Sequence, residues 1–271
     1  MKFFQSLRKR STRRQPGSPT VVKFAGGMGT QIIQAAVYFA LREDGESALA
    51  DLRYFDTASK MAVVGDKGKA THWFWQLDQY GLMRDTFETI ENKDLSNHYM
   101  LSDGPEMMEF GLQALQRPEI QRHFLPADIS AFNIPIDIST PFLCLHVRRG
   151  DYVNVASHLV SDDEFLQLAR KFSGLVQHAV LLSDSPFEDG FRNKMSQLFG
   201  SVSYLDNLDP YSSHWLMRKA QVLVCSNSTY SLTAAMLNTA GLIVMPKQWF
   251  GPDDHAIEVP IQALCNFQIM S

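Results

Sequence analysis

A regular alternation of strand and helix runs through the carboxyl-terminal half of the chain. Short apolar runs predict strands at 143–147, 179–182, 202–205, 222–225 and 242–245. Helical stretches follow, first after the capping-box pattern Ser161-Asp162-Asp163-Glu164 and then at 187–199, 211–220 and 229–240. Strands and helices in this order imply a parallel sheet with right-handed crossovers. All its strands then end along one edge, which is where open α/β sheets bind ligands.

The strand at 143–147 ends in a charged cluster. Pro141 precedes it, and Arg148, Arg149, Gly150 and Asp151 follow it. Two arginines at the end of a buried strand suit a bidentate grip on phosphate, because the guanidinium group is planar and its N–H donors form a fork. The structural alternative is an ordinary strand leaving the core, with Arg149 in solvent and Arg148 paired with Asp151.

Two further polar clusters follow strands of the same predicted sheet. Ser183 and Asp184 follow 179–182, and Ser226, Asn227, Ser228, Thr229 and Ser231 follow 222–225. The second cluster precedes a helix, so hydroxyl groups, backbone N–H groups and the positive helix end would face one point, as in phosphate sites. A plain N-cap would need only one of these serines. Asp184 could accept hydrogen bonds from a ribose or a base, or cap the next helix.

A glycine-rich turn joins the first predicted strand, 20–25, to the first predicted helix, 32–41. It reads Gly26-Gly27-Met28-Gly29-Thr30-Gln31, with Thr30 as the expected N-cap. Its backbone N–H groups could hold an anion, or the glycines could serve only a tight turn. The turn is not a dinucleotide fingerprint, because Ile32 replaces the third glycine, and it is not a P-loop, because no Lys-Ser or Lys-Thr follows.

The segment between these two regions has a looser pattern. A strand is predicted at 47–51, an aromatic helix face over 73–80 with its rings packed in the core, and a helix at 107–115. Pro135 and Pro141 flank the expected domain boundary. The predicted organisation is a basic flexible arm at 1–17, an amino-terminal α/β domain at 18–138 and a carboxyl-terminal domain at 139–271.

Charge is distributed unevenly along the chain. Six of the 25 basic groups and no acidic group lie in residues 1–16, which leaves 19 basic against 29 acidic groups in the remainder. The acidic body argues against nucleic-acid binding. The basic arm, with Phe3, Phe4 and Leu7, suggests either peripheral contact with an anionic membrane through residues 2–14 or a solvated tail.

Other patterns exclude several classes of protein. The chain has neither an apolar run of about 18 residues nor a secretory signal pattern, so a cytoplasmic location without a transmembrane span is expected. Cys144, Cys225 and Cys265 are widely separated and are predicted to be reduced, with the first two in the core. The sequence has no H-E-x-x-H pattern and its histidines are scattered, so a phosphate site without a metal ion is predicted.

Six segments, taken together and in this order, resemble glycosyltransferase family 11, the α-1,2-fucosyltransferases. They are the glycine-rich turn at 26–31, His146-Val147-Arg148-Arg149-Gly150-Asp151-Tyr152, Ser183-Asp184, Leu216-Met217, Ser226-Asn227-Ser228-Thr229-Tyr230-Ser231 and Pro246-Lys247-Gln248-Trp249-Phe250. The H-x-R-R-x-D pattern is also shared with α-1,6- and protein O-fucosyltransferases. The resemblance therefore marks a GDP-fucose site more firmly than it marks the linkage formed.

The resemblance implies a GT-B-like α/β fold, in which two Rossmann-type parallel-sheet domains face a cleft. The implied reaction is an inverting transfer of fucose from GDP-fucose to a glycan hydroxyl, such as the 2-OH of galactose, with no metal ion and no cofactor besides the donor. Carried over by position, Arg148 and Arg149 would bind the diphosphate, and His146 and Asp151 would complete the catalytic pocket. Asp184 would lie near the nucleoside. The phosphate and fucose would be lined by Ser226, Asn227, Ser228, Thr229 and Ser231, and the residues that face the cleft would be Gly26, Gly27, Gly29, Thr30 and Gln31.

The chain departs from the family pattern at several positions. Thr30 stands where the family has Asn, Ser185 and Phe187 where it has an acid and a later Trp, and Leu232 and Thr233 where it has two tryptophans. Two alternatives stay open: a transferase for another nucleotide sugar, and a catalytically degenerate nucleotide-sugar-binding protein. The general base is also open, because Asp151 is the nearest acid but the charge of the adjacent arginines would make it a poor base.

Overall fold

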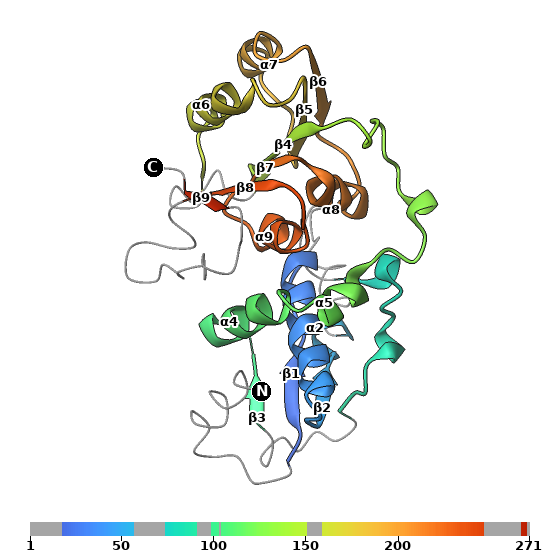
Figure 1. Cartoon of the computed structure of the whole chain (residues 1–271). Helices are drawn as coiled ribbons and strands as arrows, with labels where there is room; N and C mark the ends of the chain where they lie inside the picture. The colour runs from blue at the N-terminus through green and yellow to red at the C-terminus, as the bar shows by residue number, and fades with distance from the viewer. Residues whose placement is uncertain are drawn as a thin grey trace. The chain divides into compact units, whose positions relative to one another are not determined.

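The computed structural model of the chain describes residues 18–56, 74–90, 99–102, 104–150, 159–246 and 267–269. The chain divides into two compact units, 1–127 and 128–271 (Figure 1). The predicted basic arm at 1–17 lies outside the described residues, and the boundary expected between 138 and 139 falls inside the second unit. No helix in the described ranges is long and apolar enough to cross a membrane.

The amino-terminal unit is built on a three-stranded parallel sheet with the strand order β2-β1-β3. Its elements are β1 (Thr20–Lys23), α2 (Met28–Glu43), β2 (Ala48–Asp51), η1 (Asp78–Tyr80), η2 (Arg84–Thr86), β3 (Tyr99–Leu101), α4 (Pro105–Ala114), α5 (Pro118–Gln121) and η3 (Arg122–Phe124). Thr20 lies opposite both Ala48 of β2 and Tyr99 of β3, so β1 is the central strand. Its Val21 and Val22 are fully buried, as a central parallel strand requires.

Helix α2 begins earlier than the sequence predicts. Gly27 is its N-cap, with φ −81° and ψ 178°, and the Gly27 carbonyl accepts a hydrogen bond of 3.0 Å from the Gln31 backbone N–H. The prediction that Thr30 caps this helix is wrong, because Gly27 supplies the extended backbone of an N-cap and Thr30 already lies in the first turn.

The predicted aromatic helix over 73–80 is wrong for the part that the structure describes. Residues 74–77 are not helical, and only the short 3₁₀ turn η1 follows them. Tertiary contacts decide this conformation. The Trp75 ring lies 5.4 Å from that of Phe87, and its indole N–H donates a 2.8 Å hydrogen bond to the Leu82 carbonyl. Side-chain contacts therefore hold this segment in a non-helical conformation, although its aromatic residues have helical spacing.

The carboxyl-terminal unit contains a six-stranded parallel sheet with the order β6-β5-β4-β7-β8-β9. Its elements are η4 (Ile129–Ala131), β4 (Phe142–Val147), α6 (Asp162–Phe172), β5 (His178–Ser183), α7 (Asp189–Ser196), β6 (Ser201–Leu205), α8 (Pro210–Lys219), β7 (Val222–Val224), α9 (Thr229–Met236), β8 (Leu242–Met245) and β9 (Phe267–Ile269). The predicted alternation and all five predicted strands are confirmed, and β9 was not predicted. Each unit therefore carries a parallel sheet of the Rossmann type.

Helix α9 ends earlier than predicted. The expected helix continues to Ala240, but the observed one stops at Met236. The Asn238 side chain accounts for this end, because its amide donates hydrogen bonds to the Met217 and Ala220 carbonyls and its oxygen accepts one from the Gly241 backbone N–H. Helix α7 is likewise shorter than its predicted range, 187–199.

The chain order creates a topological switch point between β4 and β7. From β4 the chain passes through α6 to β5 and then through α7 to β6, which lie on one side. It returns through α8 to β7 and continues through α9 to β8 on the other side. In open parallel sheets, ligands bind in the crevice at the carboxyl ends of the strands that flank such a point.

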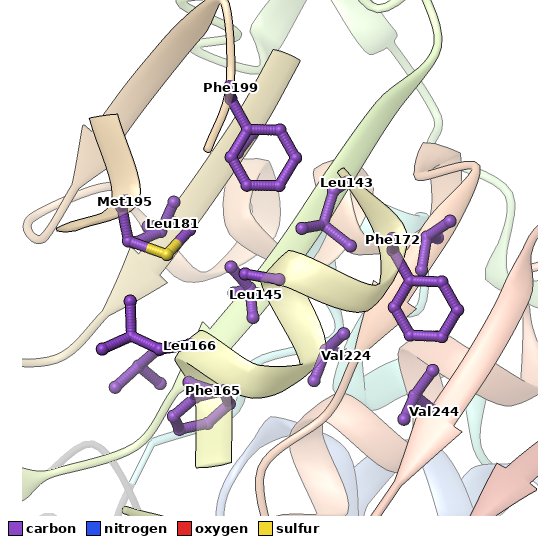
Figure 2. Close-up of a cluster of buried hydrophobic side chains, with 14 of the residues drawn as sticks. Leu143, Leu145, Phe165, Leu166, Phe172, Leu181, Met195, Phe199, Val224 and Val244 are labelled. Carbon is purple, nitrogen blue, oxygen red and sulfur yellow. The ribbon is translucent and has the colours of Figure 1, made fainter. Parts of the chain in front are cut away.

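Helices α6 and α7 cover one face of this sheet. Leu143 and Leu145 of β4 pack there with Phe165 of α6 and Met195 of α7, and all four side chains are fully buried (Figure 2). Successive side chains of a strand point to opposite faces. His146 therefore points to the other face, where α8 and α9 pack.

Two cysteines lie in this unit's core. Cys144 and Cys225 are buried free thiols, and burial raises the pKa of both. The prediction of reduced core cysteines is confirmed for these two residues, and Cys265 lies outside the described part of the chain.

Candidate functional site

The carboxyl ends of β4, β5 and β7 lie side by side at the switch point. The parallel register aligns Val147 of β4 with Ser183 of β5, and Leu145 of β4 with Val224 of β7. The polar residues that follow these three strands must therefore emerge along one edge of the sheet.

Side-chain contacts join the three predicted polar clusters along this edge. Arg148 Nη1 lies 2.9 Å from Asp184 Oδ2, and His146 Nδ1 lies 2.8 Å from Ser226 Oγ. The sequence prediction that the clusters converge agrees with these contacts. The candidate base Asp151 lies outside the described residues.

Asp184 also holds the turn that follows β4. Its Oδ1 accepts hydrogen bonds from the backbone N–H of Arg149 at 2.8 Å and from that of Gly150 at 3.1 Å. The turn passes so close to this carboxylate that a Cβ added at Gly150 would lie 2.5 Å from Oδ2. Asp184 does not cap the next helix, because Glu188 is the N-cap of α7.

The two adjacent arginines diverge. Arg149 Nη1 donates a 2.7 Å hydrogen bond to the Val160 carbonyl, and Nη2 forms an ion pair with Asp162 in the first turn of α6. The Arg149 guanidinium carbon also lies 5.7 Å from the centre of the Phe165 ring. The structure thus places Arg148 at the β4–β5 edge, whereas the Arg149 side chain joins the turn to α6.

His146 is an uncharged hydrogen-bonding group at neutral pH. It is 7% exposed, and burial lowers its pKa to about 3, with the charge of Arg148 acting in the same direction. Its described partner is the buried Ser226 hydroxyl. His146 can therefore shape the edge and hold Ser226, but it is too weakly basic to remove a proton efficiently from an acceptor hydroxyl.

The low pKa of His146 predicts an acid-sensitive fold. Unfolded histidine binds a proton below a pH of about 6.5, whereas folded His146 stays neutral until about pH 3. The free energy of unfolding should therefore fall as pH decreases from about 6.5, by up to about 1.4 kcal/mol per pH unit for this group. Urea unfolding measured at several pH values should show a shallower pH dependence for His146→Asn. Equal slopes for the two proteins would contradict the assignment.

Several hydroxyls of the serine-rich loop hold the loop itself. Ser228 is the N-cap of α9 and accepts a hydrogen bond from the Tyr230 backbone N–H at 3.3 Å. The Ser231 hydroxyl donates to the Ser226 and Ser228 carbonyls at 3.1 and 3.2 Å. Asn227 is also buried. The loop is therefore a rigid, internally bonded entry to α9, and its hydroxyls are not all directed at one external point.

The two positions where the family has tryptophans lie inside α9. Leu232 and Thr233 are both fully buried. The Thr233 hydroxyl donates to the Thr229 and Tyr230 carbonyls and lies 3.3 Å from His214 Nε2. These two departures therefore change the packing on the buried side of α9 and not the polar edge formed by Arg148, Asp184, His146 and Ser226.

Two further side chains extend the buried surroundings of His146, because Tyr230 packs against His146 and His214 packs against Tyr230. The Tyr230 ring lies between two imidazoles, with its centroid 5.4 Å from that of His146 and 5.3 Å from that of His214. His214 is fully buried on α8, and burial lowers its pKa well below the ordinary range. Tyr230 lies in the serine-rich segment that carries the family resemblance, whereas a lone histidine within a helix was the only sequence signal for His214.

The glycine-rich turn is held by a buried glutamine. Gln31 Nε2 donates to the carbonyls of Gly26 and Phe74, each at 2.8 Å, and its Oε1 accepts from the Gln76 backbone N–H at 2.8 Å. Gly26 has φ +77°, a conformation that favours glycine, and Gly29 lies inside the first turn of α2. Gln31 therefore braces the turn from within, and the ligand role predicted for the turn stays a prediction.

Comparisons with known proteins give a family and a fold. The model of a family described as Glycosyl transferase family 11 matches residues 75–258. No curated protein matches the sequence. Escherichia coli heptosyltransferase WaaC with ADP is similar in structure, with a TM-score of 0.51 and 11% sequence identity over 93% of this chain and 92% of that chain.

Two other solved structures are similar at lower scores. E. coli ADP-heptose lps heptosyltransferase II has a TM-score of 0.47 and 10% identity over 93% of this chain and 89% of its own. POFUT1 in complex with GDP has a TM-score of 0.45 and 13% identity over 85% of this chain and 98% of its own. At 11% identity the likeness to WaaC speaks for the fold alone, and together with the two parallel sheets it confirms the predicted GT-B-like class.

Proposed function

The chain belongs to glycosyl transferase family 11, and on that premise we propose that it transfers fucose from GDP-fucose to a glycan hydroxyl, with the 2-OH of galactose as the acceptor group. The transfer inverts the anomeric centre and uses no metal ion. The observation that carries the proposal is the position of Arg148, which Asp184 holds at the carboxyl edge beside the switch point.

The proposed reaction requires the protein to stabilise the negative charge on a leaving diphosphate. In an inverting transfer the acceptor hydroxyl attacks the anomeric carbon from the face opposite the leaving group, through a transition state with oxocarbenium character. Negative charge then builds on the diphosphate. A fixed guanidinium at Arg148 and the N-terminal end of α9 are suited to stabilise that charge without reorganising.

The other site residues have different kinds of support. His146 and Ser226 form a buried pair that shapes the edge beside Arg148. Donor contacts from Arg149, Asn227 and Thr229 stay predictions, as does the role of Asp151 as general base.

A donor-selectivity measurement tests the proposal. Calorimetric titration should show that GDP binds more tightly than UDP, and GDP-fucose should be the preferred donor in a hydrolysis screen across GDP- and UDP-sugars. Transfer to a galactoside acceptor should follow. Preference for UDP would point to another nucleotide sugar, and tight GDP-fucose binding without turnover on any glycan would indicate a degenerate binding protein.

A further inference from the structure

Resting on this proposed function, we propose that Asp184 is a positioning residue that aims Arg148 at the donor diphosphate and does not itself bind the ribose or base. Asp184 contacts three successive residues of the turn after β4. One of its oxygens pairs with the Arg148 guanidinium at 2.9 Å, and the other accepts the backbone N–H groups of Arg149 and Gly150.

The hydrogen-bonding capacity of Asp184 is largely used by this turn. A carboxylate offers about four lone-pair positions, and described donors occupy three of them. A Cβ at Gly150 would lie only 2.5 Å from Oδ2, so the carboxylate packs directly against the backbone of the turn. Asp184 therefore faces the protein, where it can orient Arg148 but has little capacity left for a nucleoside.

Two backbone N–H groups fix the Asp184 carboxylate, so the ion pair orients Arg148 as well as balancing its charge. Because the carboxylate is fixed from behind, Arg148 is held in one orientation before a ligand arrives. Its side chain is only 23% exposed. Binding then costs less side-chain entropy, because the ligand does not have to order the guanidinium itself.

Asp184→Asn separates the two functions of the carboxylate. The amide oxygen can still accept the two backbone N–H groups, but its nitrogen cannot accept from Arg148. In calorimetric titrations with GDP we expect Asp184→Asn to bind about 10- to 100-fold more weakly than the wild type. In an Arg148→Ala background the same substitution should weaken GDP binding no further, because the partner is gone. Asp163→Asn, which makes the same change in charge at an exposed position in the first turn of α6, should bind GDP normally.

Binding of 2′-deoxy-GDP and 3′-deoxy-GDP distinguishes the nucleoside role. If Asp184 bound a ribose hydroxyl, Asp184→Asn would lower the affinity for GDP but not for the matching deoxy analogue. The loss of GDP affinity caused by Asp184→Asn would then also add to the loss caused by Arg148→Ala. Either result would overturn the proposal. Urea unfolding checks that each variant folds. If Asp184→Asn does not fold, Gly150→Ala displaces the same carboxylate and can replace it in this double-mutant cycle with Arg148→Ala. A wild-type protein that prefers UDP would refute the proposed donor, and the same cycle run with UDP would still test Asp184.

Discussion

Arg148→Ala is expected to lower the rate of fucosyl transfer by about 10²- to 10³-fold, the usual cost of removing one group that stabilises transition-state charge. The loss is expected because the variant lacks the fixed guanidinium that the proposal places beside the leaving diphosphate. Stability should change by less than about 1 kcal/mol, because the Arg148–Asp184 pair is partly exposed to solvent and such pairs contribute little. Steady-state transfer assays and urea unfolding measure the two quantities.

Two further variants make this result specific. Arg148→Lys keeps the charge but lacks the planar fork, so it should recover only part of the lost rate. Arg170→Ala removes the same charge from an exposed position in the last turn of α6 and should transfer fucose at the normal rate. A well-folded Arg148→Ala protein with normal activity would exclude Arg148 from the diphosphate site.

The carboxyl-terminal sheet could be predicted because its central strands are buried on both faces. All six residues of β4 are buried, so the strand appears in the sequence as a continuous apolar run. The capping box that starts α6 is equally local, with Ser161 and Glu164 each bonded to the other's backbone. Strand β3 has no such signal, since it is three residues long and exists through its pairing with β1.

The convergence of the three polar clusters could be predicted from the sequence, but the pairing of each arginine with its carboxylate could not. Parallel topology alone requires that the strand ends lie together, and the order of the motifs indicated the family that the family model confirms. Which carboxylate meets which arginine depends on the path of the turn. Arg148 and Arg149 are neighbours in sequence, yet one reaches Asp184 after β5 and the other Asp162 in α6.

Serine patterns were ambiguous for a related reason. A hydroxyl before a helix can cap the helix or bind phosphate, and both uses have the same sequence signature. The structure shows Ser228 as the cap and Ser231 bonded to the loop carbonyls. Ser228 and Ser231 therefore have local partners in the structure, and the donor contacts that the resemblance implies for them stay predictions.

Gly150→Ala should weaken GDP binding by about 10- to 100-fold, although it removes no functional group. The added Cβ would lie 2.5 Å from Asp184 Oδ2, a distance at which the carboxylate must move. Moving it breaks the pairing with Arg148 and the two backbone hydrogen bonds at once. Gly150 also has φ +21°, which alanine rarely adopts, so stability should fall by about 1–2 kcal/mol.

Removing the Asp184 carboxylate tests whether it causes the loss of GDP affinity in Gly150→Ala. In an Asp184→Ala background the Cβ at position 150 has no carboxylate to displace, so Gly150→Ala should change GDP affinity by less than about 2-fold. Gly174→Ala is the matched control, because a Cβ there has nothing within 4 Å. If Gly150→Ala weakened GDP binding equally in both backgrounds, the turn itself would contact the donor. Equal affinity of Gly150→Ala and the wild type would instead mean that Arg148 finds its orientation without Asp184.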